Sequence, residues 1–200
     1  ERYYVESDKK EIKNDEKSST VPKGYKFNRI GQANLDINKS GALYVSSGKA
    51  DVTRYMRALG PTPIGKLMGQ YGTTIQHITV KEDLKKASTN EMMKTTSELL
   101  LSNPKLRNEI NNSIFAGSVG IEINEASLKE AINNPKSKNA AKIAYATSAI
   151  LADPNYVNEA KQVYSFYRDK GYDAIPDLND ILTGTSETAT IVINPSKLEV

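Results

Sequence analysis

The chain has 200 residues, of which 38% are hydrophobic and 26% charged, as expected for one ordinary domain or a domain with a tail. It has no cysteine and a single histidine, which excludes disulfide frameworks, thiolate zinc sites and chemistry that needs two imidazoles. Its 27 Lys and Arg are interspersed with 24 Asp and Glu, so we expect no nucleic-acid partner. No apolar run approaches the roughly 18 residues of a membrane helix, so we expect no transmembrane segment.

The first 22 residues mix charges densely and show no sustained apolar period. Such a segment buries too little apolar surface to offset the entropy lost on ordering. We therefore predict a flexible leader or linker over residues 1–22 and a single α+β domain over residues 23–200.

The first half of the domain has the pattern of short strands. β-prone residues over 25–30, 35–37 and 42–45, with turn residues at 38–41, predict strands and a hairpin. Apolar residues spaced at i, i+3, i+4 and i+7 predict a helix over 51–59. Residues 73–80 again favour a strand.

The middle of the chain has helical signals. Ser88 and Glu91 have the spacing of a capping box, which predicts a helix to about Leu101. Asn103 and Pro104 begin the next predicted helix, whose apolar stripe runs to Ile114. The remaining predicted elements are a strand over 119–123, helices over 125–133, 137–151 and 153–170, and a closing strand over 188–194. Together they predict an α+β fold with a short-stranded sheet formed from both ends of the chain and a helical middle.

Two short motifs match catalytic or phosphate-binding patterns in spacing alone. The segment from Gly60 to Lys66 has the spacing of a phosphate loop, but Pro61 and Pro63 remove two N–H donors, which favours a rigid turn. Ser46 to Lys49 is formally S-x-x-K, yet the partner motifs are absent, so a helix cap is the better interpretation.

Oxygen-bearing residues gather after residue 172. Asp177, Asn179 and Asp180 could contribute metal ligands, but the spacing of a calcium loop is absent, so turns and caps are favoured over a metal. His77 lies on the strand face opposite Ile78. It is either a lone base or ligand donor, or a strand residue with a satisfied hydrogen bond, and the second is favoured.

Two segments carry a resemblance to a known family. Ala42-Leu-Tyr-Val-Ser-Ser47 precedes the predicted helix 51–59, and the chain ends with KGYDAIPDLND over 170–180 and ATIVINPSKL over 189–198. Together they resemble the opening strand and the closing segment of the ADP-ribosyltransferase-like fold. The likeness is greatest to divergent members in bacteriophage head-associated proteins and polymorphic toxins.

The resemblance implies an NAD site between the opening and last strands. The family's opening strand supplies a His or Arg that grips NAD, and its last strand a Glu that polarises the nicotinamide ribose; Val45 and Ala189 stand at these positions. Glu187 would share the face of Ala189, displaced by about 7 Å, and becomes the expected catalytic carboxylate. The residues expected to bind the cofactor are Tyr44, Ser46, Ser47 and His77.

Two functions follow from the resemblance. The first is a secreted or phage-associated effector or toxin-type domain that binds NAD, either a transferase or glycohydrolase or a catalytically degenerate relative. The alternative is a non-enzymatic binding module on the same scaffold, whose Tyr-rich surface meets a protein partner. An accidental resemblance in an unrelated α+β domain is the third reading. A pocket that holds Tyr44, Ser46 and Glu187 together would favour the first.

Overall fold

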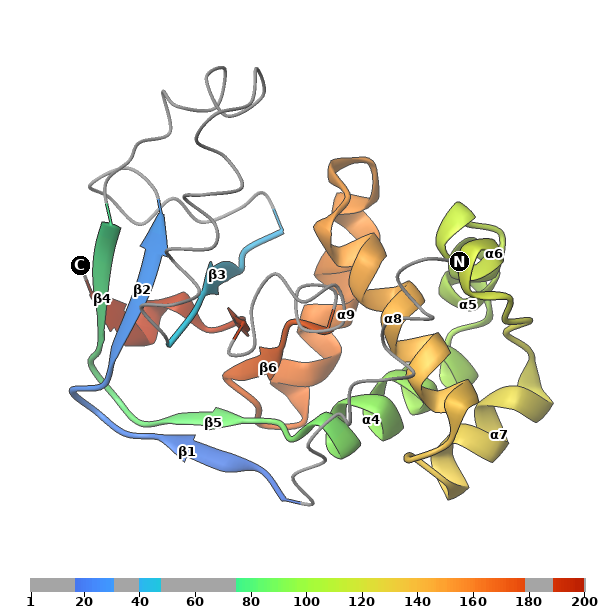
Figure 1. Ribbon diagram of the computed structural model, residues 1–200, viewed down its shortest axis with the longest axis horizontal. Coiled ribbons are helices and arrows are strands. Elements are labelled where there is room, and N and C mark those ends of the chain that lie inside the picture. The colour runs from blue at the N-terminus through green and yellow to red at the C-terminus, as the bar shows by residue number, and fades with distance from the viewer. Residues whose placement is uncertain (1–16, 31–39, 48–74, 179–188, 200) are drawn as a thin grey trace.

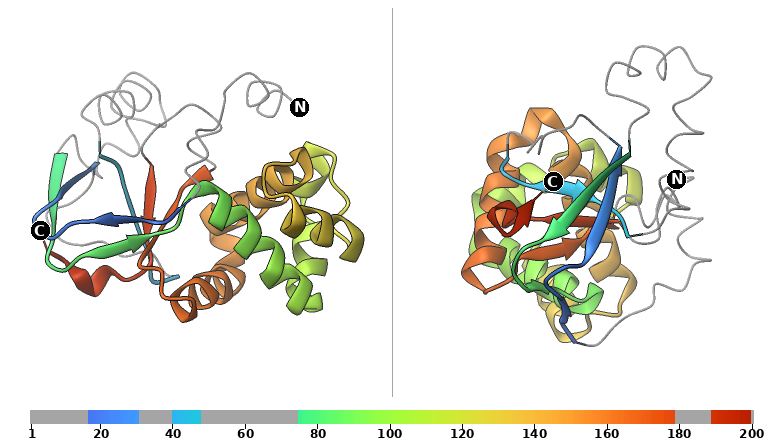
Figure 2. Two further views of the ribbon diagram at one scale, coloured as in Figure 1. Left: turned by 90° about the horizontal axis from the view of Figure 1, so that it is seen from below. Right: turned by 90° about the vertical axis from the view of Figure 1, so that its left-hand side faces the viewer.

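The computed structural model describes residues 17–30, 40–47, 75–178 and 189–199. Within these residues, strands occupy one end of the long axis and helices the other (Figures 1 and 2). The predicted α+β class is confirmed, because the structure combines helices with open sheets. The predicted helix 51–59, the predicted strand 35–37 and the first half of the predicted turn 38–41 lie outside the described residues.

The described strands form two sheets. A five-stranded sheet has the order β1-β5-β6-β7-β3, and a three-stranded sheet the order β2-β4-β8. Strands from both ends of the chain are neighbours, since β3 pairs antiparallel with β7. The strands are β1 (Ser19–Val21), β2 (Lys26–Ile30), β3 (Leu43–Val45), β4 (Ile75–Val80), β5 (Leu84–Lys86), β6 (Ala174–Pro176), β7 (Thr190–Val192) and β8 (Leu198–Glu199).

Each sheet contains one of two strand pairs, and the chain passes directly from one pair to the other. β1 pairs with β5 and β2 pairs with β4, and both pairs are antiparallel. Between β1 and β2 the chain turns at Gly24, whose φ of +86° favours glycine and whose N–H donates to the Val80 carbonyl at 2.7 Å. Among the described residues, strand β1 begins at Ser19, within the segment over 1–22 that was predicted as a leader or linker.

Local capping signals set most helix starts. Ser88 and Glu91 form the predicted capping box, and Asn103 accepts from the Leu106 N–H at the start of the next helix. Ser137 caps the alanine-rich helix in the same way. The α-helices are α4 (Thr89–Ser102), α5 (Pro104–Asn111), α6 (Ile114–Val119), α7 (Glu125–Asn133), α8 (Lys138–Ala152) and α9 (Val157–Asp169), with 3-10 turns η2 (Pro154–Tyr156) and η3 (Pro195–Lys197).

The predicted strand over 119–123 is wrong. α6 ends at Val119, and Gly120 closes it with a φ of +63°, so the helix stop lies inside the predicted strand. The Ile123 N–H donates to the Asn111 side chain at 2.7 Å instead of to a neighbouring strand. Ile114 also departs from the predicted stripe: Ser113 caps a new helix there, and the Ile114 side chain is 78% exposed.

Two apolar clusters cover the two faces of the five-stranded sheet. The first joins the helices to one face, and Tyr44 and Ile191 belong to that side. The second includes Phe27 and Ile78 from the smaller sheet and Leu43 and Val45 from the larger one, so it lies between the sheets. Successive residues of β3 therefore point alternately to the helices and to the second sheet.

Candidate functional site

The two segments that carry the family resemblance lie side by side. β3 and β7 form an antiparallel pair in which Val45 is opposite Thr190. Ala189, directly before β7, continues the neighbouring pairing of β7 with β6, because its carbonyl accepts from the Asp177 N–H at 3.0 Å. Since Ala189 precedes Thr190 by one residue, its side chain points to the face opposite Val45. Both are buried, so the two family positions hold apolar side chains that do not face each other.

Tyr44 contacts the helices through its hydroxyl. Its hydroxyl donates to the Leu151 carbonyl at 3.2 Å and lies 2.9 Å from the Tyr164 hydroxyl. Both contacts are with α8 and α9, on the helical face of the sheet. Tyr44 therefore packs in the core between the five-stranded sheet and the helices, whereas His77 belongs to the three-stranded sheet.

Asn28 joins three of the residues that the sequence singled out. Its main chain exchanges hydrogen bonds with Ser46, at 2.7 Å and 3.0 Å, and its Nδ2 donates to the Ser47 carbonyl at 3.5 Å. Its Oδ1 lies 2.9 Å from Nδ1 of His77, directly opposite on β4. The serines thus meet Asn28 through main-chain atoms. Sequence reasoning missed Asn28, which nothing but strand register could have indicated.

His77 presents one ring nitrogen to solvent. Because Asn28 Nδ2 donates to Ser47, its Oδ1 faces the imidazole and accepts from Nδ1–H. Nε2 of the neutral ring is then an acceptor at an exposed position. The favoured interpretation of His77, a strand residue with a satisfied hydrogen bond, agrees with this geometry.

A polar pair lies on the face of the large sheet that Val45 shares. Lys86, at the end of β5, donates from Nζ to Oγ1 of Thr190 at 2.8 Å. Thr190 is fully buried opposite Val45, and Lys86 is half-buried. Neither residue was a candidate from sequence, because their side chains meet across 104 positions of chain.

The acidic segment after Gly171 starts with a structural carboxylate. Asp173 accepts from the Lys85 N–H at 2.9 Å and the Asn194 amide at 3.0 Å, and pairs with Lys197 at 3.2 Å. Burial raises the pKa of Asp173, but these bonds outweigh burial and hold the pKa below its ordinary value. Asp173 thereby links β5 to the end of the chain.

Of the three residues that were weighed as metal ligands against turns and caps, only Asp177 lies within the described residues. Asp177 is buried at the end of β6, and no group of three or more His, Asp or Glu is arranged for a metal among the described residues. Asn179, Asp180 and Glu187 lie outside the described residues.

Three of the described tyrosines lie inside the structure. Tyr164 and Tyr167 are fully buried, and Tyr145 is nearly so. The Tyr167 hydroxyl donates to the Met92 carbonyl at 2.8 Å and meets Thr96 Oγ1 at the same distance. The expected Tyr-rich surface is therefore not formed by these three side chains.

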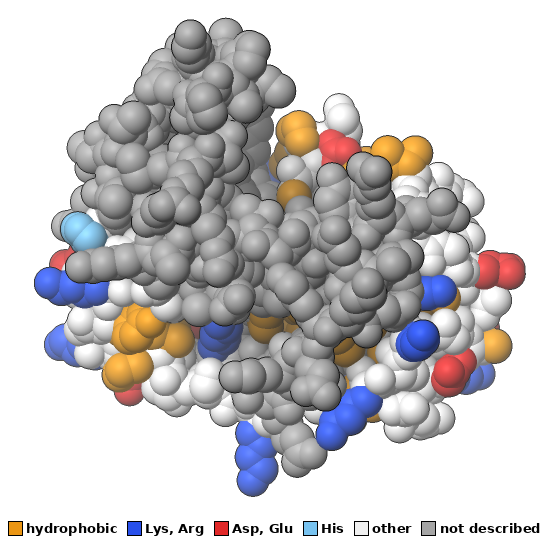
Figure 3. Space-filling model, in the orientation of Figure 1, with side chains coloured by type: hydrophobic (Ala, Val, Ile, Leu, Met, Phe, Trp, Pro, Cys, Tyr) orange, Lys and Arg blue, Asp and Glu red, His pale blue; other side chains and the backbone are white. Residues whose placement is uncertain are grey.

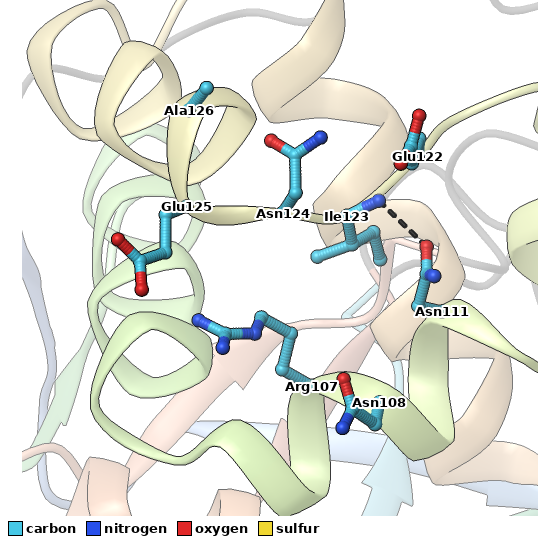
Figure 4. A pocket seen from close by; sticks show the side chains of 8 residues that line it. All are labelled: Arg107, Asn108, Asn111, Glu122, Ile123, Asn124, Glu125 and Ala126. Carbon is cyan, nitrogen blue, oxygen red and sulfur yellow. Dashed lines mark hydrogen bonds between the residues drawn. The ribbon is translucent and has the colours of Figure 1, made fainter.

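A cavity that is wide open to solvent lies at the helical end of the molecule. It has a volume of about 530 Å³ and lies between α5 and the start of α7 (Figure 4). Its polar lining comprises Arg107, Asn108, Asn111, Glu122, Asn124 and Glu125. None of these residues was a candidate from sequence, since each also suits an ordinary exposed helix or loop.

Comparison with known proteins identifies no relative. No protein-family model, curated protein or solved structure matches the chain. Among the described residues, no helix has the length and apolar character needed to cross a bilayer. On the described part of the face in Figure 3, Lys and Arg side chains are scattered rather than gathered in one patch.

Proposed function

We propose that this chain is a non-enzymatic binding module on an ADP-ribosyltransferase-like scaffold, with a protein as its partner. The observation that carries the proposal is the state of the two family positions. Val45 and Ala189 are buried apolar residues, and strand alternation directs them to opposite faces. Neither side chain can bind a dinucleotide through charge or polarise a ribose, so the chemistry of the family has no support at these positions.

A second candidate is an NAD-dependent effector with Glu187 as its carboxylate. Two observations favour it: β3 and β7 are neighbours, as the resemblance implies, and Lys86 places a cation on the face that Val45 shares. A cation there suits a pyrophosphate. In this candidate Ser46, Ser47 and His77 contribute to the cofactor site, and a secreted, toxin-type or phage-associated role is part of the same proposal.

The experiment that separates the two is NAD titration with a nicotinamide-release assay. Binding is measured by calorimetry and turnover by free nicotinamide, for the wild-type chain and Glu187→Ala. The binding module predicts no saturable heat and no nicotinamide from either. Turnover by the wild type that disappears in Glu187→Ala would overturn the proposal and establish the second candidate.

The partner is sought with the same purified chain. We expect the immobilised folded chain to retain a protein from a lysate of the source cells, and soluble folded chain to compete for it. Heat-unfolded chain is the matched control and should retain none of it. NAD turnover together with no competed protein would count against the binding module.

A further inference from the structure

The cavity between α5 and α7 has a fixed wall. Leu106 and Ile110 bury one side of α5, and Leu128 buries α7 in the same core. The Asn111 side chain accepts from the Ile123 N–H at 2.7 Å, which ties α5 to the segment before α7. Asn124 caps α7 by accepting from the Ser127 N–H at 2.9 Å. The polar lining therefore stands on a preorganised backbone, which lowers the entropy lost on binding.

Charges of both signs line this cavity without neutralising one another. Figure 4 shows the Arg107 guanidinium directed across the space toward the side where Glu125 lies, yet within the described residues Arg107 has no hydrogen-bond or ion-pair partner for its side chain. The Glu122 carboxylate likewise has no such partner there. Glu125 contacts Lys129 at 3.8 Å, in a largely exposed pair that contributes little.

The charge balance selects the ligand class. One guanidinium and two carboxylates give the lining a net negative charge, which disfavours a simple anion such as phosphate. A ligand with a carboxylate and an ammonium group satisfies both signs: the carboxylate can take a bidentate bond from Arg107, and the ammonium can donate to Glu122 or Glu125. The amide of Asn108 offers a donor and an acceptor to a peptide unit, and Asn124 offers its Nδ2 as a donor while its Oδ1 caps α7.

We propose that this cavity binds a zwitterion of the amino-acid class, either a free amino acid or a short peptide with free ends. Its volume of about 530 Å³ leaves room for such a ligand, which would remain partly in contact with solvent because Asn108, Glu122 and Glu125 are exposed. The site goes beyond the proposed function, because it lies at the helical end, away from β3 and β7 (Figure 1). NAD turnover, present or absent, leaves it standing.

The test is an NMR titration of the ¹⁵N-labelled full chain. The probes are trialanine with free ends and each of the twenty free amino acids, with N-acetyl-trialanine, trialanine amide, acetate and phosphate as comparisons. Saturable shifts are expected at the side-chain amides of Asn108, Asn111 and Asn124 and at Nε–H of Arg107. Blocking either end of a bound peptide should weaken binding tenfold or more, because each removes a charge-assisted hydrogen bond. Binding of free amino acids but not of peptides, or of peptides but not of free amino acids, would identify which of the two is the ligand.

Variants show whether the cavity is responsible. Arg107→Gln should weaken binding of the same probe at least tenfold, while Lys105→Gln on the same helix, outside the cavity lining, should leave it unchanged. If Arg107→Gln fails to fold, Glu122→Gln and Glu125→Gln test the ammonium side instead. Absence of shifts with every zwitterion, equal binding of acetate, or equal affinity in folded Arg107→Gln would each overturn the proposal.

Discussion

The Tyr44 hydroxyl lies 2.9 Å from the Tyr164 hydroxyl and joins strand β3 to helix α9 across 120 positions of chain. The same Tyr44 hydroxyl donates to the Leu151 carbonyl in α8. A residue that the sequence placed in a cofactor pocket therefore connects the sheet to two helices. Its substitution should change stability.

Tyr44→Phe is expected to lower the free energy of unfolding by about 1 kcal/mol, because the Leu151 carbonyl and the Tyr164 hydroxyl lose a partner. Urea denaturation measures it. The control is Tyr25→Phe, whose hydroxyl has no hydrogen bond among the described residues and should change stability by a few tenths of a kcal/mol at most. Unchanged stability with weakened NAD binding in Tyr44→Phe would restore the cofactor-pocket interpretation.

The neutral form of the His77 imidazole should exist as a single tautomer. Because Asn28 Oδ1 accepts from Nδ1–H, long-range ¹H–¹⁵N spectra at high pH should show a protonated Nδ1 and an unprotonated Nε2. The chain has one histidine, so the signals need no further assignment. Asn28→Ala should release the ring to a mixture of tautomers. The same spectrum in wild type and Asn28→Ala would show that the bond is not formed.

Two neighbouring glycines should respond to alanine in opposite directions. Gly117 lies within α6 and a Cβ there meets nothing within 4 Å, so Gly117→Ala should stabilise the protein by up to about 1 kcal/mol. Gly120 closes the same helix at a φ of +63°, where a side chain is strained, so Gly120→Ala should destabilise it by about 1 kcal/mol. Thermal unfolding of both variants checks the signs. The same sign at both positions would contradict the end of α6 at Val119.

The pairing of Asp173 should make stability depend on pH in the acid range. Its pKa is lowered in the folded state by the bonds from Lys85, Asn194 and Lys197 acting against burial, so the folded protein binds fewer protons there than the unfolded chain. The resulting stabilisation is complete above the ordinary carboxyl pKa and is lost as the pH falls through the lower folded value.

Asp173→Asn should therefore lower stability at neutral pH by about 2 kcal/mol and flatten the acid limb of the pH profile. Urea unfolding from pH 7 into the acid range measures both effects. Asp169→Asn is the control, because this carboxylate is exposed and has no hydrogen bond among the described residues. An acid limb as steep in Asp173→Asn as in wild type would show that other groups govern it.

Part of the candidate site was predictable, because strand alternation alone placed His77 on the face opposite Ile78, and the structure buries Ile78 while leaving His77 exposed. The hydrogen-bond partner of His77 was not predictable, because Asn28 lies opposite it only through the pairing register of β2 with β4. Lys86 and Thr190 belong to strands of three residues each, too short to show a period. The cavity was equally hidden, because Arg107 and Glu125 meet only when α5 and α7 pack.

The sequence by itself determined the helix starts at Ser88, Asn103 and Ser137, because a cap is an interaction between residues three positions apart. It also determined the α+β class and the contribution of both chain ends to one sheet. Tertiary structure alone decided that Tyr44 faces the helices, that Val45 and Ala189 point apart, and that Arg107 lines a cavity. Each of these depends on which strand or helix is the neighbour, and that choice is made by contacts between distant segments that leave no local pattern.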